Sequence, residues 1–441
     1  MSKQSRTPRF VSLVLFLSLL SLCTVQCGAE DAPARPEVAP ATVHWVTWDT
    51  TSQAEATLVE QFRESYPHVE FKRDSLNSNW QTLLSQSPLP DLVNMDADYE
   101  FEMLIRQNRV ADLTELWDEA GLLEQVPASL QKLTEQDGKQ FYVPFGFGWV
   151  GVYYNKGVFA QYNLQPPQTW DEFIAICDTL RANGETPLSI GGSEPWSSYG
   201  WFEYMNLRLN GPQFHRDLLR GKEHYDDARV RAVMEQWKLL FDNAYYVENP
   251  QLMGGLNAVA ALMRNEKART LTREKAVMVL SDAYNVSQLP TLFLDELAFF
   301  RFPTMDANVP AAEAVDLFGY LVPVGADHTP QALAFLAHLS TPAAQAIVAQ
   351  EGLFSSVTYA PARADVDLEQ LRFDQRQALE LLQATDEAVP QMWLALPDEV
   401  WGMMTYEFSR FVREPHDIEI FMQRLEEIRQ KAVASGKLSG E

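Results

Sequence analysis

Residues 138–155 have the sequence GKQFYVPFGFGWVGVYYN, and this stretch decides how the rest of the chain is interpreted. A charged turn leads into an apolar run in which aromatic residues alternate with glycines. Such alternation is typical of a β-strand, and glycine leaves the backbone open to a flat molecule beside the rings. We therefore predict a strand that crosses between two lobes and lines the cleft between them, on which Trp149 either faces a ligand or packs in the second lobe.

The same stretch contains Gly146, Gly148 and Gly151, spaced as in the Gly-x-Gly-x-x-Gly dinucleotide fingerprint. That motif binds pyrophosphate at the N-terminus of a helix. Here residues 152–155 continue in β-favouring residue types instead. A nucleotide site is therefore not expected, and no other cofactor is indicated.

Length and charge narrow the class of protein. A chain of 441 residues is suited to two domains. Its 35 Lys and Arg residues face 60 Asp and Glu residues, and such an acidic surface repels nucleic-acid phosphate and anionic lipid. Nucleic acid is thus an unlikely partner, and a monomeric protein is expected.

The N-terminus is typical of an exported protein. Basic residues precede an apolar run at 10–22 that is short for a membrane span, so residues 1–27 are predicted to be a signal peptide. Cys27 stands where a bacterial lipoprotein is lipidated; ordinary cleavage nearby is the alternative. Residues 28–41 are rich in Pro and Ala, which indicates a flexible tether or a disordered tail. We expect a periplasmic protein, or one attached to the outer face of the membrane by this lipid anchor alone.

The first folded segments alternate between strand and helix. Residues 42–48, 69–72 and 92–95 are β-favouring, with helical stretches between them, which predicts a parallel sheet with crossover helices. Ligands bind beyond the carboxyl ends of such strands. The residues at these ends are Trp48, Asp49 and Asp96.

Two helices are predicted to begin with capping boxes, Ser52 with Glu55 and Thr169 with Glu172. The second helix would bury Cys177 as a core thiol, since no histidine lies near it in the sequence to activate it. With a single cysteine in the body of the chain, the mature protein has no internal disulfide.

Acidic residues are dense at 96–102, where the sequence is DADYEFE. A calcium loop requires a glycine at its sharp turn, and none follows here. The segment is therefore interpreted as a solvated acidic edge. The seven histidines are scattered, and no metal site is predicted.

Aromatic residues are the positive functional signal. The chain contains 11 tryptophans, several at segment ends or in predicted loops such as 194–201. Sugar rings stack on indoles and their hydroxyls bind carboxylates and amides; for any single tryptophan, plain packing is an equally good explanation. As a set they favour a carbohydrate cleft: Trp48, Trp149, Trp196, Trp201, Trp393 and Trp401.

An exported glycoside hydrolase is the alternative function. It would require two facing carboxylates, such as Asp49 and Asp96, one of them with a raised pKa. Among 60 acidic residues, two at one edge prove nothing.

Several short motifs, in order, resemble the extracellular solute-binding proteins of bacterial sugar ABC importers, the group of the maltodextrin-binding protein. The motifs are PDLV at 90–93, GKQFYVP at 138–144, VYYNK at 152–156, PPQTWDEF at 166–173, KAVMVLSDAY at 275–284 and PQMW at 390–393. Each motif is weak alone, but their order and spacing cover residues 42–434.

The resemblance implies an α/β protein with the two-lobe periplasmic-binding-protein type II fold, a hinge and an interlobe ligand cleft. It implies a non-catalytic receptor that binds a neutral mono- or oligosaccharide and delivers it to membrane permease subunits. It matches Phe145 to the ligand-binding aromatic that follows the proline of the family's crossing strand. It places Tyr284 where the family has a tryptophan, and either Trp393 or Trp401 at its late aromatic position. Lobe one would comprise residues 42–146 plus 317–360, and lobe two residues 147–316 plus 361–441.

Overall fold

The computed structural model describes residues 37–76, 80–85, 87–264, 270–352 and 359–440. The predicted signal peptide, Cys27 and the tether up to residue 36 lie outside these residues. The last tether residues are bound to the folded part: Gln331 Nε2 donates to the Ala39 carbonyl at 2.8 Å, and Val38 is buried. Residues 38–441 form one unit.

The N-terminal strands form the predicted parallel arrangement. β1 (Ala41–Thr47) pairs in parallel with β2 (Val69–Ser75) on one side and with β3 (Leu92–Asp96) on the other. The helix α1 (Gln53–Ser65) connects β1 to β2 and buries Leu58 and Phe62. Other elements up to residue 140 are α2 (Trp80–Leu83), α3 (Tyr99–Arg106), α4 (Thr114–Glu119), α5 (Leu122–Gln125), α6 (Ala128–Thr134), β4 (Glu135–Gln136) and β5 (Lys139–Gln140).

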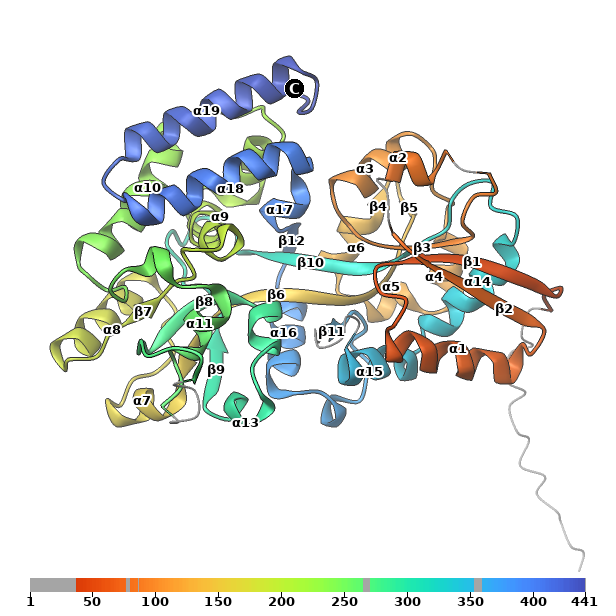
Figure 1. The fold of residues 1–441 in the computed structure, drawn as a ribbon, viewed down its shortest axis with the longest axis horizontal. Coiled ribbons are helices and arrows are strands. Elements are labelled where there is room, and N and C mark those ends of the chain that lie inside the picture. Colours follow the sequence, from red (N-terminus) through yellow and green to blue (C-terminus); the bar gives the residue numbers. More distant parts are fainter. Residues whose placement is uncertain (1–36, 77–79, 86, 265–269, 353–358, 441) are drawn as a thin grey trace, which may run out of the picture. The chain divides into compact units, whose positions relative to one another are not determined.

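Two long strands join the two ends of the sheet (Figure 1). β6 (Val143–Asn155) is the strand predicted from the opening stretch, and it is antiparallel to β10 (Ala312–Leu321). The sheet order is β2-β1-β3-β10-β6-β8-β7, with β8 (Met278–Asp282) and β7 (Leu188–Ser189) at the far end. Shorter strands add to this path: β9 (Leu297–Phe300) and β11 (Ala360–Pro361) on β6, and β12 (Glu387–Pro390) on β10.

The strand β6 contributes to two separate hydrophobic cores. Phe145, Phe147 and Trp149 belong to the core that contains the N-terminal strands. Val150 and Val152 belong to a second core, formed mainly by helices of the later sequence. Tyr153, which follows Val152, belongs to the first core again, so alternate residues of β6 pack into different cores and this one strand links the two.

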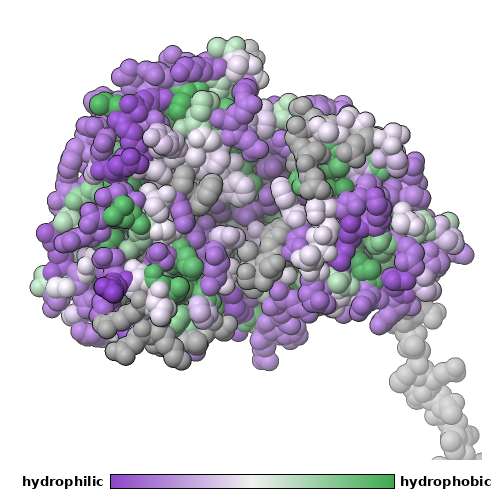
Figure 2. Space-filling model, in the orientation of Figure 1, coloured by the Kyte–Doolittle hydropathy of each residue, from purple (hydrophilic) through white to green (hydrophobic). Residues whose placement is uncertain are grey.

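The second core is formed mainly by helices, and α18 packs against both α9 and α19. The remaining elements are α7 (Lys156–Gln161), α8 (Trp170–Ala182), α9 (Pro195–Leu219), α10 (Ala228–Asp242), η1 (Pro250–Leu252), α11 (Gly255–Ala260), α12 (Ala283–Ser287), α13 (Thr291–Leu294), α14 (Thr329–Leu339), α15 (Pro342–Glu351), η3 (Leu368–Gln370), α16 (Phe373–Gln383), α17 (Met392–Ala395), α18 (Asp398–Arg413) and α19 (Ile418–Ala434). Hydrophilic residues cover most of the face seen in Figure 2.

One predicted loop is wrong. Residues 194–201 do not form a loop, because α9 begins at Pro195. Proline is favoured at the first helical position, where its missing N–H has no helical partner to lose. The aromatic density of this segment therefore belongs to the first turns of a helix that is interrupted at Gly211, whose φ is 80°.

Of the two predicted capping boxes, one is confirmed. Thr169 and the N3 residue Glu172 cap each other reciprocally at the start of α8. At α1, Ser52 accepts a hydrogen bond from the Glu55 N–H at 3.3 Å, but the Glu55 carboxylate instead accepts one from the Thr47 hydroxyl at 2.8 Å. Glu55 is drawn into the core by this contact, so the box is incomplete.

Cys177 is wholly buried in α8 without a disulfide, as predicted. Burial raises the pKa of its thiol. Among the described residues, no single helix is long and apolar enough to cross a membrane; α14 and α15 pass that test only as a pair bent by 73°.

Candidate ligand-binding site

Three aspartates lie on one face of the sheet where the two cores meet. Asp96 at the end of β3 is paired with Phe318 of β10. Two residues before Phe318, Asp316 is paired with Gly148 of β6. Two residues after Gly148, Val150 is paired with Asp282 at the end of β8. Paired residues and residues two apart point to the same side of a sheet, so Asp96, Asp316 and Asp282 share that side.

The glycines of β6 lie on this same side. A Cβ atom at Gly148 would lie 3.3 Å from Asp316 Cβ and 3.4 Å from the ring of Tyr359. At Gly146 it would lie 3.0 Å from Tyr359 Cβ. The glycines therefore make room for Tyr359, whose hydroxyl donates to Asp316 Oδ2 at 3.2 Å. The predicted open backbone is real, but part of the space is filled by Tyr359.

Burial sets the protonation of these carboxyl groups. It raises the pKa of Asp96, and the neighbouring charges of Asp316 and Asp98 raise that pKa further. Burial also raises the pKa of Asp316, to about 6, against the opposing effect of the Tyr359 hydroxyl. Asp96 thus binds a proton more tightly than a solvated carboxyl group does. A carboxyl group that is protonated can donate a hydrogen bond, and an ionised one only accepts.

Asp282 has a structural role as well. Its side chain caps α12, accepting hydrogen bonds from Asn285 N at 2.9 Å and from Asn285 Nδ2 at 3.0 Å. Burial raises its pKa, and these hydrogen bonds oppose that effect. Both hydrogen bonds go to Asp282 Oδ1, and a carboxylate has about four acceptor positions in all.

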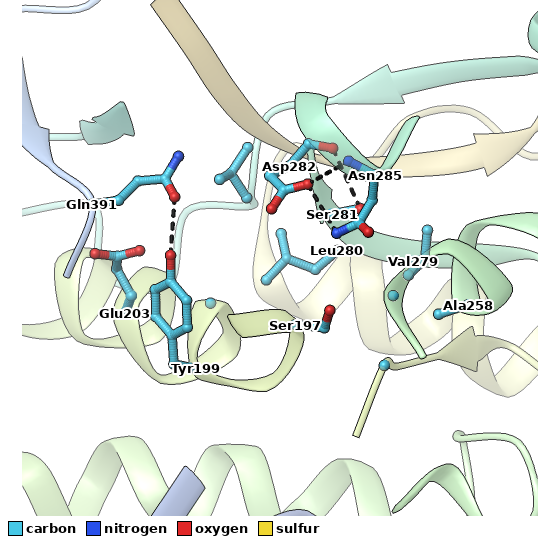
Figure 3. A pocket seen from close by; sticks show the side chains of 14 residues that line it. Ser197, Tyr199, Glu203, Ala258, Val279, Leu280, Ser281, Asp282, Asn285 and Gln391 are labelled. Carbon is cyan, nitrogen blue, oxygen red and sulfur yellow. Dashed lines mark hydrogen bonds between the residues drawn. The ribbon is translucent and has the colours of Figure 1, made fainter. Parts of the chain in front are cut away.

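A small cavity of about 20 Å³ adjoins Asp282 (Figure 3). The Tyr199 hydroxyl donates to Gln391 Oε1 at 2.9 Å, and Trp393 Nε1 donates to the same oxygen at 3.1 Å. The Gln391 amide oxygen is therefore occupied twice, and its NH₂ group is the part that can serve a ligand. The other residues that line the cavity are Val150, Gly191, Ser197, Gly200, Glu203, Gly255, Ala258, Val279, Leu280, Ser281 and Asn285.

Glu203 is a wholly buried carboxyl group in the wall of this cavity. Its Oε1 accepts a hydrogen bond from Met392 N at 2.6 Å and lies 3.5 Å from His215 Nε2. Asn206 Nδ2 contacts His215 Nδ1 at 2.9 Å, while Asn206 Oδ1 accepts from Asn210. Asn206 is therefore the donor to Nδ1, and the His215 proton is on Nε2, facing Glu203.

The predicted contacts at the strand ends lie at accessible positions. Trp48, which directly follows β1, has 41% of its surface exposed, and Tyr284 in α12 has 54% exposed. Asp49 and Asp96 are half-buried. Tyr284 follows Asp282 by two residues, and Asp96 lies on the same side of the sheet as Asp282. That Trp48 and Asp49 border the same region remains a prediction.

The predicted aromatic contacts within β6 are in the core. Phe145 and Trp149 project to the side of β6 opposite Gly148 and have almost no exposed surface. The Phe145 ring lies 5.3 Å from that of Tyr320, and Trp149 Nε1 donates to the Tyr153 hydroxyl at 2.9 Å. Strand alternation places both on one face, as predicted, but that face is packed. Their contact with a ligand remains a prediction.

The other predicted tryptophans are spread over three helices. Trp201 is fully buried in α9, and Trp196 lies in its first turn. Trp401 in α18 is mostly buried, with its ring 4.9 Å from that of Tyr199. Trp393 in α17 is half-buried and is joined to the cavity through Gln391. Of the two candidates for the late aromatic position, Trp393 therefore has the more accessible ring.

The sequence reasoning missed Asp316, Tyr199, Glu203 and Gln391 as site residues, and noted Asp282 only as part of a motif. Asp316 had a detectable signal, since it is an acid in the middle of the otherwise mostly apolar strand AEAVDLFGYL. Tyr199 had none, because its segment was interpreted as a loop, and Glu203 lies just after that segment, in a stretch predicted only as helical.

The acidic run at 96–102 is not a solvated edge. Asp98 caps α3 by accepting from Phe101 N at 2.8 Å, and burial raises its pKa to about 7. Burial also raises the pKa of Glu100, and the Asp398 charge adds to that effect. These acids lie near Asp398 of α18, which is far away in the sequence. The sequence of the run alone could not reveal this neighbour.

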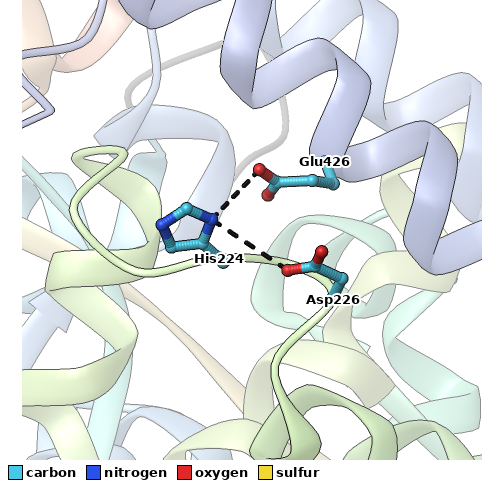
Figure 4. Close-up of side chains that lie close together, drawn as sticks. All are labelled: His224, Asp226 and Glu426. Carbon is cyan, nitrogen blue, oxygen red and sulfur yellow. Dashed lines mark hydrogen bonds and ion pairs between the residues drawn. The ribbon is translucent and has the colours of Figure 1, made fainter.

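Among the described residues, His224, Asp226 and Glu426 bring ligand atoms within 4.8 Å of one another (Figure 4). Arg429 already occupies this group: its Nη2 lies 2.6 Å from Glu426 Oε1 and 3.0 Å from His224 Nδ1. A fixed guanidinium repels a metal cation, so the cluster is explained as a surface ion-pair network.

The chain belongs to the bacterial extracellular solute-binding protein family, whose model matches residues 47–346. It is 24% identical over 216 residues to the multiple sugar-binding protein of Streptococcus mutans, covering 46% of this chain and 48% of that one. It is 32% identical over 135 residues to a probable sugar-binding periplasmic protein of Mesorhizobium japonicum, covering 30% and 31%. The chain thus matches about half or less of the length of these relatives.

Solved structures confirm the two-lobe solute-binding fold. The bacterial solute receptor AcbH, described with a preference for β-D-galactopyranose, superposes with a TM-score of 0.77 at 19% identity, over 89% of this chain and 99% of that one. RafE from Streptococcus pneumoniae superposes with a TM-score of 0.73 at 17% identity, over 90% and 99%.

Proposed function

We propose that this protein is the substrate-binding component of a carbohydrate ABC importer, acting outside the cytoplasm. It binds its solute reversibly, hands it to membrane permease subunits and catalyses no reaction. The observation that carries this proposal is the side of the sheet on which Asp96, Asp316 and Asp282 gather where the two cores meet. The sugar-binding names of several relatives support the substrate class.

The chemistry of this face suits a polyol. Sugar hydroxyls both donate and accept hydrogen bonds, and the face offers carboxyl groups, which accept and, when protonated, also donate, and the amide of Gln391. Exposed rings at its border, Trp48 and Tyr284, provide apolar surfaces for the C–H faces of a sugar.

The lobe boundaries are part of the proposal. Lobe one would comprise residues 42–146 and 317–360, and lobe two residues 147–316 and 361–441. β6 and β10 pass between them, so closure would be a hinge motion in these strands, with the ligand favouring the closed state by touching both lobes. The protein would act as a monomer.

The N-terminal proposal is export followed by lipidation at Cys27, with residues 28–36 as part of the tether. Mass spectrometry of the mature N-terminus tests it. A diacylglycerol-modified Cys27 is expected, whereas an unmodified start at Gly28 or later would show ordinary cleavage.

A thermal-shift screen over neutral mono- and oligosaccharides tests the function. A ligand held at a hundred times its dissociation constant adds about 2.7 kcal/mol of stability. We expect at least one sugar to raise the melting temperature. No shift with any sugar, together with turnover of a chromogenic glycoside, would favour the hydrolase alternative, which the relatives and structures above do not support.

Trp48→Ala tests the border of the site. The half-exposed indole should contribute more to affinity than to folding, so the variant should bind the identified sugar at least several-fold more weakly and melt near the wild-type temperature. Tyr406→Ala removes an aromatic side chain of similar exposure from α18 and is the matched control. Equal affinity of both variants for the sugar would show that Trp48 does not belong to the binding site.

A further inference from the structure

The aspartate face is the side of the sheet that carries Asp96, Asp282 and Asp316. It differs from several other buried acidic sites of the protein in whether arginine is paired with the acids. Several buried carboxylates elsewhere are paired with arginine: Glu313 with Arg208 at 2.7 Å and Asp374 with Arg372 at 2.6 Å. Glu426 has Arg429 at 2.6 Å. Pairing offsets the cost of removing a charge from water.

No such pairing occurs at the site. Among the described residues, no Lys or Arg lies within 4.0 Å of a carboxylate oxygen of Asp96, Asp282, Asp316 or Glu203. The strongest charges acting on Asp316 and Asp96 come from other carboxyl groups instead. The fold therefore leaves several acids close together without a protein cation.

Glu203 supplies an independent sign of a ligand. Its side chain is completely buried, yet its Oε2 has no hydrogen-bond partner in the described protein. It lines the cavity beside Tyr199 and Gln391 (Figure 3). An unpaired buried acceptor costs free energy that a bound donor would recover.

Tyr199 lines the same cavity as two of these acids, Glu203 from α9 and Asp282 from β8. Asp316 of β10 lies on the same side of the sheet as Asp282. After burial, the charges of Glu203, Asp282 and Asp316 contribute most to the raised pKa of Tyr199. A cation beside this ring is attracted both by the carboxylates and by the π-face.

We propose that the solute is a sugar carrying a protonated amine, and that its ammonium group binds beside Tyr199 among Glu203, Asp282 and Asp316. This inference rests on the proposed sugar-binding function and names the class of sugar. Burial raises the pKa of Glu203, Asp282 and Asp316, so without a cation these acids bind protons more readily than solvated acids do. An ammonium group beside them favours their ionised forms and supplies up to three hydrogen-bond donors.

Isothermal titration with matched sugars tests the inference. The pairs are glucosamine with glucose, galactosamine with galactose, and chitosan oligomers with their N-acetylated forms, which keep the ring but lose the charge. The amine member of at least one pair should bind ten or more times tighter than its neutral partner at pH 7.5.

Two variants locate the effect. Asp282→Asn keeps an N-cap acceptor for α12 and removes the charge, and Asp316→Asn removes the neighbouring charge. Each should reduce the amine preference at least tenfold. Asp227→Asn at the α10 N-terminus makes the same change at a cap outside the site and should leave the preference unchanged.

The outcomes separate the two proposals. Neutral sugars that bind as tightly as the amines would overturn the inference and leave the sugar-binding function intact. An amine preference that survives both site variants would also overturn it. Failure of every amine and every neutral sugar to bind would overturn the sugar-binding function and this inference together.

Discussion

The two faces of β6 have opposite roles although they belong to one strand. On one side, Phe145, Phe147 and Trp149 are buried in a core and contact other aromatic rings. On the other, Gly146 and Gly148 lie beside Asp316 and Tyr359. The aromatic side provides stability, and the glycine side gives space to polar groups. A residue's position in the alternation therefore predicts its role better than its chemical type does.

The largest expected difference between the faces is in stability. Phe147→Ala removes a fully buried ring and should lower the free energy of unfolding by about 3–5 kcal/mol. Urea denaturation measures this loss. Affinity of the folded fraction for its ligand should change little; a loss below about 1 kcal/mol would show that the aromatic face is not tightly packed.

Buried acids with raised pKa values should make the free energy of unfolding depend on pH. The pKa is raised by burial to about 6 for Asp316, about 7 for Asp98 and about 8 for Glu55. The folded state then binds protons more tightly than the unfolded state, so stability is greatest near pH 4–5 and is lost as pH rises through these values.

Thermal unfolding of the ligand-free protein from pH 5 to pH 8 measures this trend. Asp316→Asn should remove a part of it, up to roughly 3 kcal/mol for a pKa raised by about two units. A stability that rises steadily over this range would contradict the burial of these carboxyl groups.

Glycine substitutions compare the faces directly. A Cβ at Gly151, on the aromatic side, would lie 2.6 Å from Phe299 Cδ2, whereas one at Gly148 meets its nearest atom at 3.3 Å. Gly151→Ala should thus cost about 1–3 kcal/mol through overpacking, and Gly148→Ala less. Gly148→Ala should instead weaken ligand binding; the reverse order in a denaturation series would refute the assignment of the faces.

The smallest expected effect is that of one hydroxyl. Tyr359→Phe removes the donor to Asp316 Oδ2 and should cost about 1 kcal/mol or less. Because this hydrogen bond lowers the pKa of Asp316, that pKa should rise in the variant. Carboxyl NMR titration would detect the shift, and an unchanged pKa would show that the contact is not made in solution.

Much of the fold was predictable because it depends on local patterns. The parallel order of β1, β2 and β3 follows from alternating strand and helix signals, and the capping box at Thr169 was predicted residue by residue. The prediction of a loop at 194–201 was wrong because it followed the aromatic density of the segment and not the helix-start signal of Pro195. The capping box predicted for Ser52 and Glu55 is incomplete because the hydroxyl of Thr47, eight residues earlier, binds the Glu55 carboxylate instead.

The candidate site was predicted in part. Asp96 was correctly placed at a strand end, and Trp48 and Tyr284 are at accessible positions. Tyr199 and Glu203 reach the cavity from a helix whose register could not be read from its sequence. Asp316 joins them through its pairing with Gly148, which links positions 168 residues apart.

By itself, the sequence determined the class of this protein, because the order of short motifs and the strand alternation around Gly148 are properties of the chain. It also determined the acidic surface and the single internal thiol. Only the tertiary structure decided which side of β6 faces the polar site, since that depends on which strands pair with it. The same pairing decided that Asp96, Asp316 and Asp282 meet, and burial then raised the pKa of each.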